Sequence, residues 1–220
     1  HGIGFETGYA KVPLVCQSCI YDLGYGSATV RPDSEMGYAA CEKALAGGNP
    51  SSGSVGAGTG ATVGKICGME RAMKSGLGMY AVQLGELRMA AVVAVNALGD
   101  IFDPANGTKI AGLMNEDRTA FGDSCEELWK LGCPQNLFTG NTTIGAVITN
   151  GQFNKAQMNK IASMTRNAYA RCINPVGTMA DGDSIYAASI GDVKADINVT
   201  GTLAAHVMER AIVKAVESAR

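Results

Sequence analysis

Glycine occupies 29 of the 220 positions of this chain, about twice its average share in globular proteins. Its densest cluster is residues 53–65, GSVGAGTGATVGK. Because glycine has no Cβ, such a cluster marks tight turns and places where two backbones approach closely. The chain is also 46% hydrophobic and only 17% charged, which excludes a disordered protein. The sequence therefore predicts one folded domain, or at most two small ones, with a sizeable core and many close backbone contacts.

The glycine cluster does not match either common phosphate-binding motif. A Walker loop would need a glycine where Thr59 stands and a serine or threonine where Ile66 stands. The two registers of GxGxxG that start inside the cluster end on Ala61 or Val63 instead of glycine. Two interpretations remain open. The segment is either a tight turn with close backbone packing, or a loop that shapes a catalytic pocket and presents Lys65.

Charge and hydropathy exclude two classes of partner. The net charge is −2, aromatic residues make up 6% of the chain, and the cations are scattered, so a nucleic-acid-binding face is not expected. The longest apolar run, Met89 to Val95, is the length of a buried strand and falls far short of the roughly 18 residues of a membrane helix. We therefore expect a soluble protein.

The seven cysteines form no regular framework and include a single CxxC, Cys16 to Cys19. A zinc site would need about four ligands, and His1 and His206 are the only histidines that could join the cysteines. We expect no metal site, and reduced thiols in a cytoplasmic protein. The chain begins at His1 rather than methionine, so an upstream segment is expected to have been removed or left out.

Hydrophobic patterning predicts interspersed helices and strands. Strands are expected at 11–23, 78–84, 87–98, 142–149 and 184–190, with a tight turn at 85–86. Helices are expected at 34–46, 124–131 and 154–173, and from Thr200 or Thr202 onward, with Glu209, Lys214 and Glu217 facing solvent. Residues 99–122 have the composition of a surface excursion. The mixture favours an α+β layered fold over a doubly wound parallel sheet.

Hydrolytic chemistry in this chain would have to work without histidine. His1 lies at the chain end, His206 falls in the middle of an expected helix, and the motif GxSxG does not occur. A threonine at a chain N-terminus needs no histidine, because its own α-amino group is the base. Such a residue is exposed by cleavage in a loop that leads into a strand. The sequence Gly140-Asn141-Thr142-Thr143 has this form, which makes Thr142 the candidate nucleophile.

Polar residues elsewhere could serve such a nucleophile. In an extended segment the carboxylates of Asp181 and Asp183 would lie on the same side, with Gly182 between them. They could hold the ammonium group of Thr142, a substrate amine or a metal, and a plain acidic turn is the alternative. Asn96 follows seven apolar residues. Its side chain could cap the strand end or donate its amide to an oxyanion.

Taken together, the motifs resemble one known family. They are GSVGAGTGATVGK, AAVVAVNALGD, NTTIGAVITN followed by NKAQMNKIASM, and NPVGTMADGDSIYAAS. In this order they are similar to the self-processing aminopeptidases of the L-aminopeptidase/D-esterase type, whose relatives include β-peptidyl aminopeptidases and nylon-oligomer hydrolases. The resemblance covers nearly the whole chain. Members of that family extend further upstream, so the N-terminal part of their fold is expected to be missing here.

The resemblance implies an α/β/β/α sandwich of the N-terminal-nucleophile type. It also implies a precursor that cuts itself between Asn141 and Thr142. The two products would be an α-chain portion at 1–141 and a β chain at 142–220, which together form one domain. These αβ units are expected to assemble into a larger homo-oligomer.

Site residues follow from the same resemblance. Thr142 corresponds to the nucleophile, Lys65 to a cation that keeps the amine neutral, and Asn96 to the oxyanion donor. Asp181 and Asp183 correspond to the acidic pair that orients the nucleophile. Tyr21 falls where relatives place an aromatic residue of the substrate pocket, and Tyr25 is an equal candidate.

The function implied is an autoproteolytically activated amide hydrolase, an aminopeptidase or amidase acting through an acyl-enzyme on peptides or ω-amino acid oligomers. No cofactor is implied. Two alternatives stay open: an acyltransferase of the ornithine-acetyltransferase type, and an unprocessed, non-catalytic subunit.

Overall fold

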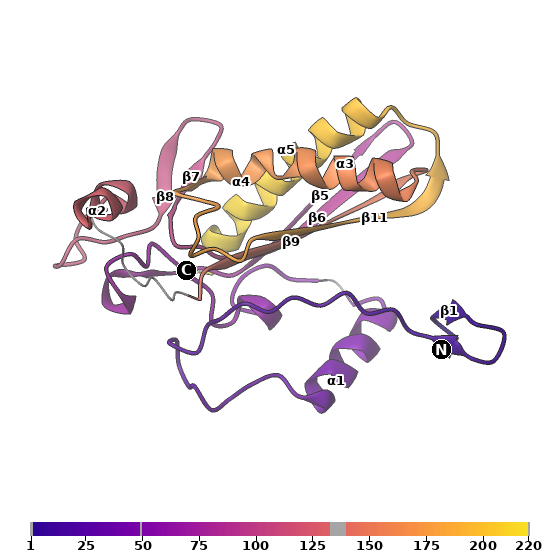
Figure 1. The fold of residues 1–220 in the computed structure, drawn as a ribbon, viewed down its shortest axis with the longest axis horizontal. Coiled ribbons are helices and arrows are strands. Elements are labelled where there is room, and N and C mark those ends of the chain that lie inside the picture. Colours follow the sequence, from indigo (N-terminus) through magenta and orange to yellow (C-terminus); the bar gives the residue numbers. More distant parts are fainter. Residues whose placement is uncertain (1, 49, 133–139, 220) are drawn as a thin grey trace.

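A computed structural model describes residues 2–48, 50–132 and 140–219 (Figure 1). Its centre is a four-stranded sheet with the strand order β11-β9-β6-β5. These strands are β5 (Leu77–Leu84), β6 (Leu87–Asn96), β9 (Thr142–Gly151) and β11 (Ser184–Val193). The pairs β5–β6 and β6–β9 are antiparallel, and β9–β11 is parallel. The sheet is therefore mixed, and the predicted α+β class is confirmed.

Strands β5 and β6 form the hairpin that the sequence predicts, with ends within two residues of the expected ones. Gly85 in the turn has φ of +60°, a conformation that suits glycine. Along β9, buried and half-buried residues alternate, because one face of the strand lies against helices. The register sets Asn96, the last residue of β6, opposite Thr142, the first residue of β9.

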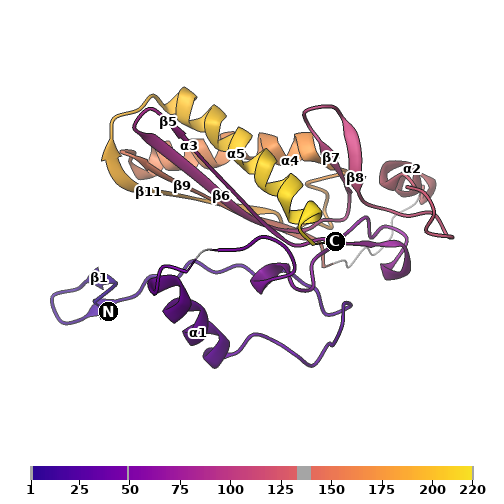
Figure 2. The same cartoon turned by 180° about the vertical axis from the view of Figure 1, so that it is seen from behind.

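One face of the sheet is covered by a layer of helices (Figures 1 and 2). The layer consists of α3 (Lys155–Thr165), α4 (Asn167–Cys172) and α5 (Ile197–Glu217). The core lies between this layer and the sheet, and its largest buried side chains include Met89, Val93, Ile161, Tyr169, Met208 and Ile212. Among the described residues, this sheet and its helical layer correspond to one half of the expected α/β/β/α sandwich.

Three expectations about these helices are wrong. The helix expected at 154–173 is two helices, which meet at Arg166. The last helix begins at Ile197, because the Asp196 carboxylate caps its first turn by accepting from the N–H groups of residues 198 and 199. Glu209 on this helix is only 8% exposed, because it forms an ion pair with Arg171 of α4.

Residues 99–122 are not a surface excursion. They contain the hairpin of β7 (Asp100–Asp103) and β8 (Thr108–Ala111), and β10 (Ile173–Asn174) adds a third strand to it. The buried Asp100 carboxylate accepts from the Leu113 N–H, from Ser124 and from the Lys109 ammonium. These contacts attach the hairpin to α2 (Ser124–Lys130), the helix expected at 124–131.

The N-terminal part, drawn in indigo and violet, lies on the side of the sheet opposite α3–α5 (Figure 1). The buried strand expected at 11–23 is wrong, because only Lys11–Val12 (β2) is extended there, paired with β1 (Phe5–Glu6), and both strands are exposed. Helix α1 (Ser34–Leu45) forms as predicted and is capped by Asp33. A short ladder of β3 (Thr62–Val63) and β4 (Met73–Lys74) leads to the main sheet. Within the described residues, no helix is both long and apolar enough to cross a bilayer.

Candidate active site

Thr142 and Asn141 lie inside the molecule, at the start of the central strand β9. Asn141 is 2% exposed and Thr142 is 9% exposed. The Thr142 hydroxyl donates to the carbonyl oxygen of Asn141 at 2.5 Å. The oxygen expected to attack is thus in contact with the carbonyl group of the bond expected to break, in a place shielded from water.

Lys65 reaches this junction from the end of the glycine cluster. Its Nζ donates to the main-chain oxygen of Asn96 at 2.9 Å, to Asn96 Oδ1 at 2.8 Å and to the Gly140 oxygen at 3.4 Å. Burial lowers the pKa of Lys65 to about 7, against the opposing effect of the Asp181 and Asp22 carboxylates. Near neutral pH this amine is therefore poised between its charged and neutral forms.

The glycine cluster brings Lys65 there by close packing. Gly64 has φ of +69°, and a Cβ on it would lie 2.0 Å from the Leu113 nitrogen. Its own N–H donates to the Gly99 oxygen, and the Lys65 N–H donates to the Leu98 oxygen. The interpretation as a tight turn with close backbone packing is therefore confirmed. The same turn carries Lys65 to the junction, and its part in a catalytic pocket stays a prediction.

Asn96 connects the parts of the site from a fully buried position. Its Nδ2 donates to the Gly140 oxygen at 2.8 Å and to the Tyr21 oxygen at 3.1 Å. Its Oδ1 accepts from the Thr62 N–H as well as from Lys65. Both N–H bonds of this amide are therefore engaged. They hold the carbonyl oxygens of Gly140 and Tyr21 and do not contact that of Asn141.

Asp181 and Asp183 have different partners. The Asp183 Oδ1 accepts from the Thr143 N–H at 2.7 Å, and its Oδ2 is buried with no hydrogen-bond partner in the described structure. Burial raises the pKa of Asp183, the Thr143 N–H opposes this, and the charge of Asp181 adds to it. Asp181 Oδ2 accepts from the N–H and the hydroxyl of Thr178, within its own turn. In the uncut chain neither carboxylate is bonded to Thr142 itself.

The two candidate tyrosines lie in different places. The Tyr21 ring lies against Gly140, where an added Cβ would come within 2.1 Å of it, and its main-chain oxygen holds Asn96. The Tyr25 ring lies 5.4 Å from Lys74 Nζ. The structure thus brings Tyr21 to the junction together with Lys65, Asn96 and Thr142.

Sequence reasoning missed three residues of this region. The Gly182 N–H donates to the Asn141 oxygen at 2.9 Å, and only its place between two aspartates could have suggested a role. Lys74 donates to the main-chain oxygens of Gly58, Ala61 and Ser75, and burial lowers its pKa against the opposing charge of Asp22. Nothing in the sequence sets Lys74 or Asp22 apart, because their roles depend on contacts between distant segments.

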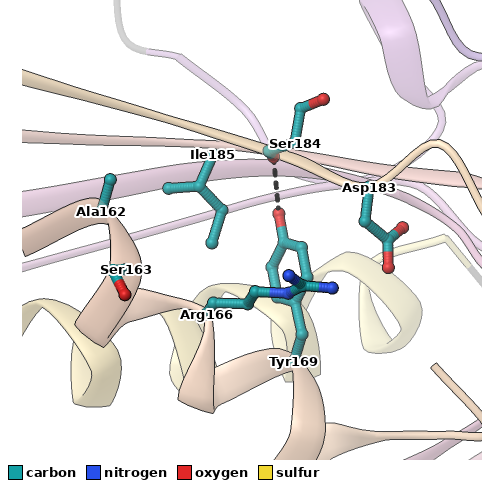
Figure 3. A pocket seen from close by; sticks show the side chains of 7 residues that line it. All are labelled: Ala162, Ser163, Arg166, Tyr169, Asp183, Ser184 and Ile185. Atoms are coloured by element: carbon teal, nitrogen blue, oxygen red, sulfur yellow. Dashed lines mark hydrogen bonds between the residues drawn. The ribbon is translucent and has the colours of Figure 1, made fainter. Parts of the chain in front are cut away.

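Behind Asp183, on the side of the helical layer, is an open hollow of about 290 Å³ (Figure 3). Its lining comes from α3, α4 and the start of β11, namely Ala162, Ser163, Arg166, Tyr169, Asp183, Ser184 and Ile185. The Tyr169 hydroxyl donates to the Ser184 oxygen at 3.2 Å and to the Thr143 oxygen at 3.4 Å. Burial raises the pKa of Tyr169 well above its usual value, so this phenol stays a donor that fixes the start of β9 against β11.

The other chemical groups considered from sequence lie elsewhere. The His206 side chain is 57% exposed, and its Nδ1 lies 3.9 Å from a Glu209 oxygen. Cys16, Cys19, Cys41, Cys67, Cys125 and Cys172 are free thiols, and Cys133 lies outside the described residues. In the described ranges, no group of three His, Cys, Asp or Glu side chains is placed to hold a metal ion.

The fold is that of the N-terminal-nucleophile hydrolases. The chain is similar to the solved structure of the L-aminopeptidase D-Ala-esterase/amidase from Ochrobactrum anthropi, a variant of that fold, with a TM-score of 0.54 and 19% identity. The match covers 83% of this chain and 50% of that one. A β-aminopeptidase from Burkholderia sp. matches with a TM-score of 0.50, 19% identity and coverage of 80% and 50%.

Residues 6–220 match the model of peptidase family S58, and the chain belongs to this family. It is 32% identical to a 6-aminohexanoate-oligomer endohydrolase of Paenarthrobacter ureafaciens, over 96% of this chain and 63% of that protein. It is 34% identical to an uncharacterized aminopeptidase of Mycobacterium leprae, over 84% of this chain and 51% of that protein. The chain thus spans half to two thirds of the length of these relatives.

Proposed function

We propose that the protein is an amide hydrolase that activates itself by cutting the bond between Asn141 and Thr142. The new α-amino group of Thr142 then takes the proton from the Thr142 hydroxyl, and this oxygen attacks an amide of the substrate. Water releases the acyl group from the enzyme. The proposed substrates are peptides or ω-amino acid oligomers, in keeping with the names of the relatives.

One observation carries this proposal. The Thr142 hydroxyl lies 2.5 Å from the Asn141 oxygen, in a buried site at the start of the central strand. A threonine that only stabilised the strand would not need to contact the preceding carbonyl group. Lys65 and Asn96, on separate segments, converge on the neighbouring residue Gly140.

The positions of the other side chains support the remaining roles that we propose. Lys65 in its charged form keeps the α-amine of Thr142 neutral, and Asn96 donates to the substrate oxyanion once residues 140 and 141 have moved away. Asp183 holds the Thr143 N–H, and Asp181 holds the turn next to it, so together they orient the nucleophile. Tyr21 contributes its ring to the substrate pocket.

Cleavage would divide the domain into an α portion at 1–141 and a β portion at 142–220. The two portions would stay together, because β9 pairs with β6 along eight residues of each strand. We extend the proposal to a homo-oligomer of such units, located in the cytoplasm, where thiols such as the six described here stay reduced.

The test is an intact mass and N-terminal sequence of the purified protein. We expect a fragment that begins Thr-Thr-Ile-Gly, which for residues 142–220 is about 8 kDa by its share of the chain. Thr142→Ala should remain uncut, and so should lack amide hydrolysis. A wild-type protein that stays whole, or a Thr142→Ala variant that is still cut, would overturn the proposal.

A further inference from the structure

The carbonyl oxygen of Asn141 has a second donor besides the Thr142 hydroxyl. The backbone N–H of Gly182 donates to it at an N···O distance of 2.9 Å. Asn141 and Asp181 form an isolated parallel bridge at this point, just before the first residues of β9 and β11. The donor is therefore already bonded, before any reaction, to the oxygen on which charge would develop. An oxyanion donor has to lie about 2.7–3.1 Å from the place that this oxygen takes in the transition state.

Asn96 does not take this position in the uncut chain. Its two amide hydrogens are engaged by the oxygens of Gly140 and Tyr21. An amide side chain has two N–H bonds, so neither is left for the Asn141 oxygen. The donor assigned to substrate turnover is therefore occupied at the stage when the chain would cut itself, and self-cleavage needs a different one.

The turn that carries Gly182 is fixed before any reaction. Asp181 accepts from the Thr178 N–H at 2.9 Å and from its hydroxyl at 2.8 Å, while the Asp181 N–H donates back to the Thr178 oxygen. A donor on such a rigid turn needs no rearrangement when charge develops. Gly182 also has no side chain to crowd the nucleophile, since a Cβ there would lie 3.0 Å from Thr142 Oγ1.

We propose that the backbone N–H of Gly182 is the oxyanion donor for cleavage of the Asn141–Thr142 bond. This inference rests on the proposed function. The Thr142 oxygen forms a bond to the Asn141 carbonyl carbon, and negative charge develops on the carbonyl oxygen at the Gly182 N–H. The carbon–nitrogen bond then breaks, and the hydroxyl proton passes to the leaving nitrogen, which becomes the α-amine. Water hydrolyses the resulting ester: its oxygen becomes part of the Asn141 carboxylate, one of its protons goes to the Thr142 oxygen, and the other is released to solvent.

The experiment removes this one N–H. Glycolic acid, the hydroxy-acid analogue of glycine, is incorporated at position 182 of the full protein during cell-free translation, so that an ester replaces the amide. The matched control carries glycolic acid at Gly122, whose N–H donates to the Leu113 oxygen at 2.8 Å in another part of the fold. Intact mass follows the rate at which the fragment beginning with Thr142 appears.

We expect the change at Gly182 to slow self-cleavage by about 10²–10³-fold and the change at Gly122 to leave it within about threefold of wild type. Self-cleavage of the Gly182 ester chain within about threefold of wild type would overturn the inference. A wild-type protein that does not cut itself would instead refute the proposed function, so the two failures are distinguishable.

A second measurement applies if the ester chain does not fold. In the uncut Thr142→Ala protein, amide hydrogen exchange of Gly182 reports directly on its hydrogen bond. We expect strong protection of this amide. Exchange at the rate of a free loop amide would show that the N–H does not hold the Asn141 carbonyl group, and would overturn the inference as well.

Discussion

The ammonium nitrogen of Lys65, a half-buried residue, lies 2.8 Å from the side-chain oxygen of the fully buried Asn96. Among the described residues, Lys65 donates to three oxygens, two of Asn96 and one of Gly140, and all belong to neutral amide groups. Burial without a directly bonded carboxylate is costly for a cation, which accounts for the lowered pKa of this lysine. The Lys65 side chain therefore lies near the Thr142 hydroxyl as an ammonium group that readily loses its proton.

This lowered pKa predicts a specific dependence of stability on pH. Between the folded-state pKa of about 7 and the ordinary value near 10.5, the unfolded chain binds more protons at Lys65 than the folded one does. The free energy of unfolding should therefore rise with pH across this window, by up to about 1.4 kcal/mol per pH unit. Below about pH 7 the lysine is charged in both states, and its contribution is constant.

Lys65→Met removes this pH dependence, and urea unfolding between pH 7 and 9 measures it. The experiment is done in the uncut Thr142→Ala background, so that unfolding involves one chain. Lys155→Met, at the exposed start of α3, is the matched control and should leave the slope unchanged. A stability difference between wild type and Lys65→Met that does not vary with pH would contradict the assignment.

Asn96→Ala should lower both stability and turnover. It leaves the Thr62 N–H without its partner, at about 1–3 kcal/mol for a buried group, and leaves the Gly140 oxygen with Lys65 alone of its two donors. Loss of the oxyanion donor should lower kcat by about 10²–10³-fold in the fraction of chains that are cut. Steady-state kinetics and a thermal melt measure the two effects.

Asn150→Ala is the control for Asn96. Asn150 joins the Arg88 N–H to the Glu86 oxygen at the far end of the same sheet. It should cost stability and leave kcat unchanged. If Asn96→Ala also turned over substrate at nearly the wild-type rate, Asn96 would have only a structural role.

Asp183→Asn should lower activity without lowering stability. The amide oxygen can still accept from the Thr143 N–H, while the charge that burial disfavours is gone. Because the folded-state pKa is raised, wild type loses stability as pH rises above the unfolded value near 4, and the variant does not. At pH 7 we expect an equal or higher Tm together with activity at least about 10²-fold lower.

The control for this variant is Asp192→Asn, at the exposed far end of the same strand β11. It should change neither quantity. Thermal melts from pH 4 to 8 measure the Tm of each variant, and an amidase assay measures its activity. Full activity in Asp183→Asn would remove this carboxylate from the proposed mechanism.

Gly64→Ala tests the packing of the glycine cluster. Gly64 and Gly107 have nearly the same φ, +69° and +73°, but a Cβ on Gly107 would meet nothing within 4 Å. Gly107→Ala should therefore cost only the backbone strain, about 1 kcal/mol. Gly64→Ala adds a clash with the Leu113 backbone and should cost at least about 4 kcal/mol, measured by urea unfolding. Similar losses in the two variants would show that the backbone at Gly64 moves away.

The elements predicted correctly are those whose signals are local. Strands β5, β6 and β9 coincide with largely apolar and β-branched runs, and α1 follows a capping aspartate and ends before Gly47. Helix α5 begins at Ile197, upstream of the expected start. Its first turn, Ile-Asn-Val-Thr, is poor in helix-forming residues, so the sequence pattern does not mark Asp196 as its cap. Asn106-Gly107 was a hairpin signal inside the segment interpreted as a loop.

The elements predicted wrongly depend on distant partners. The apolar segment 11–23 is not a buried strand, because burial depends on what lies over a segment and not on its own composition. Glu209 is buried because Arg171 meets it from another helix. For the site, local patterns make Lys65, Asn96 and Thr142 candidates and the resemblance assigns their roles. The Gly182 N–H and the Lys74 contacts arise only from the pairing of remote segments.

Strand β9 lies in the middle of the sheet, with β6 on one side and β11 on the other. If the chain is cut at its first residue, the seam between the two products runs through the core, and α5 from one product packs on β5 and β6 from the other. The amino-acid sequence that determines the fold is then divided between two polypeptides. Once denatured, they would have to find each other again in solution, so the native heterodimer would be preserved by the height of its unfolding barrier rather than by its ability to refold.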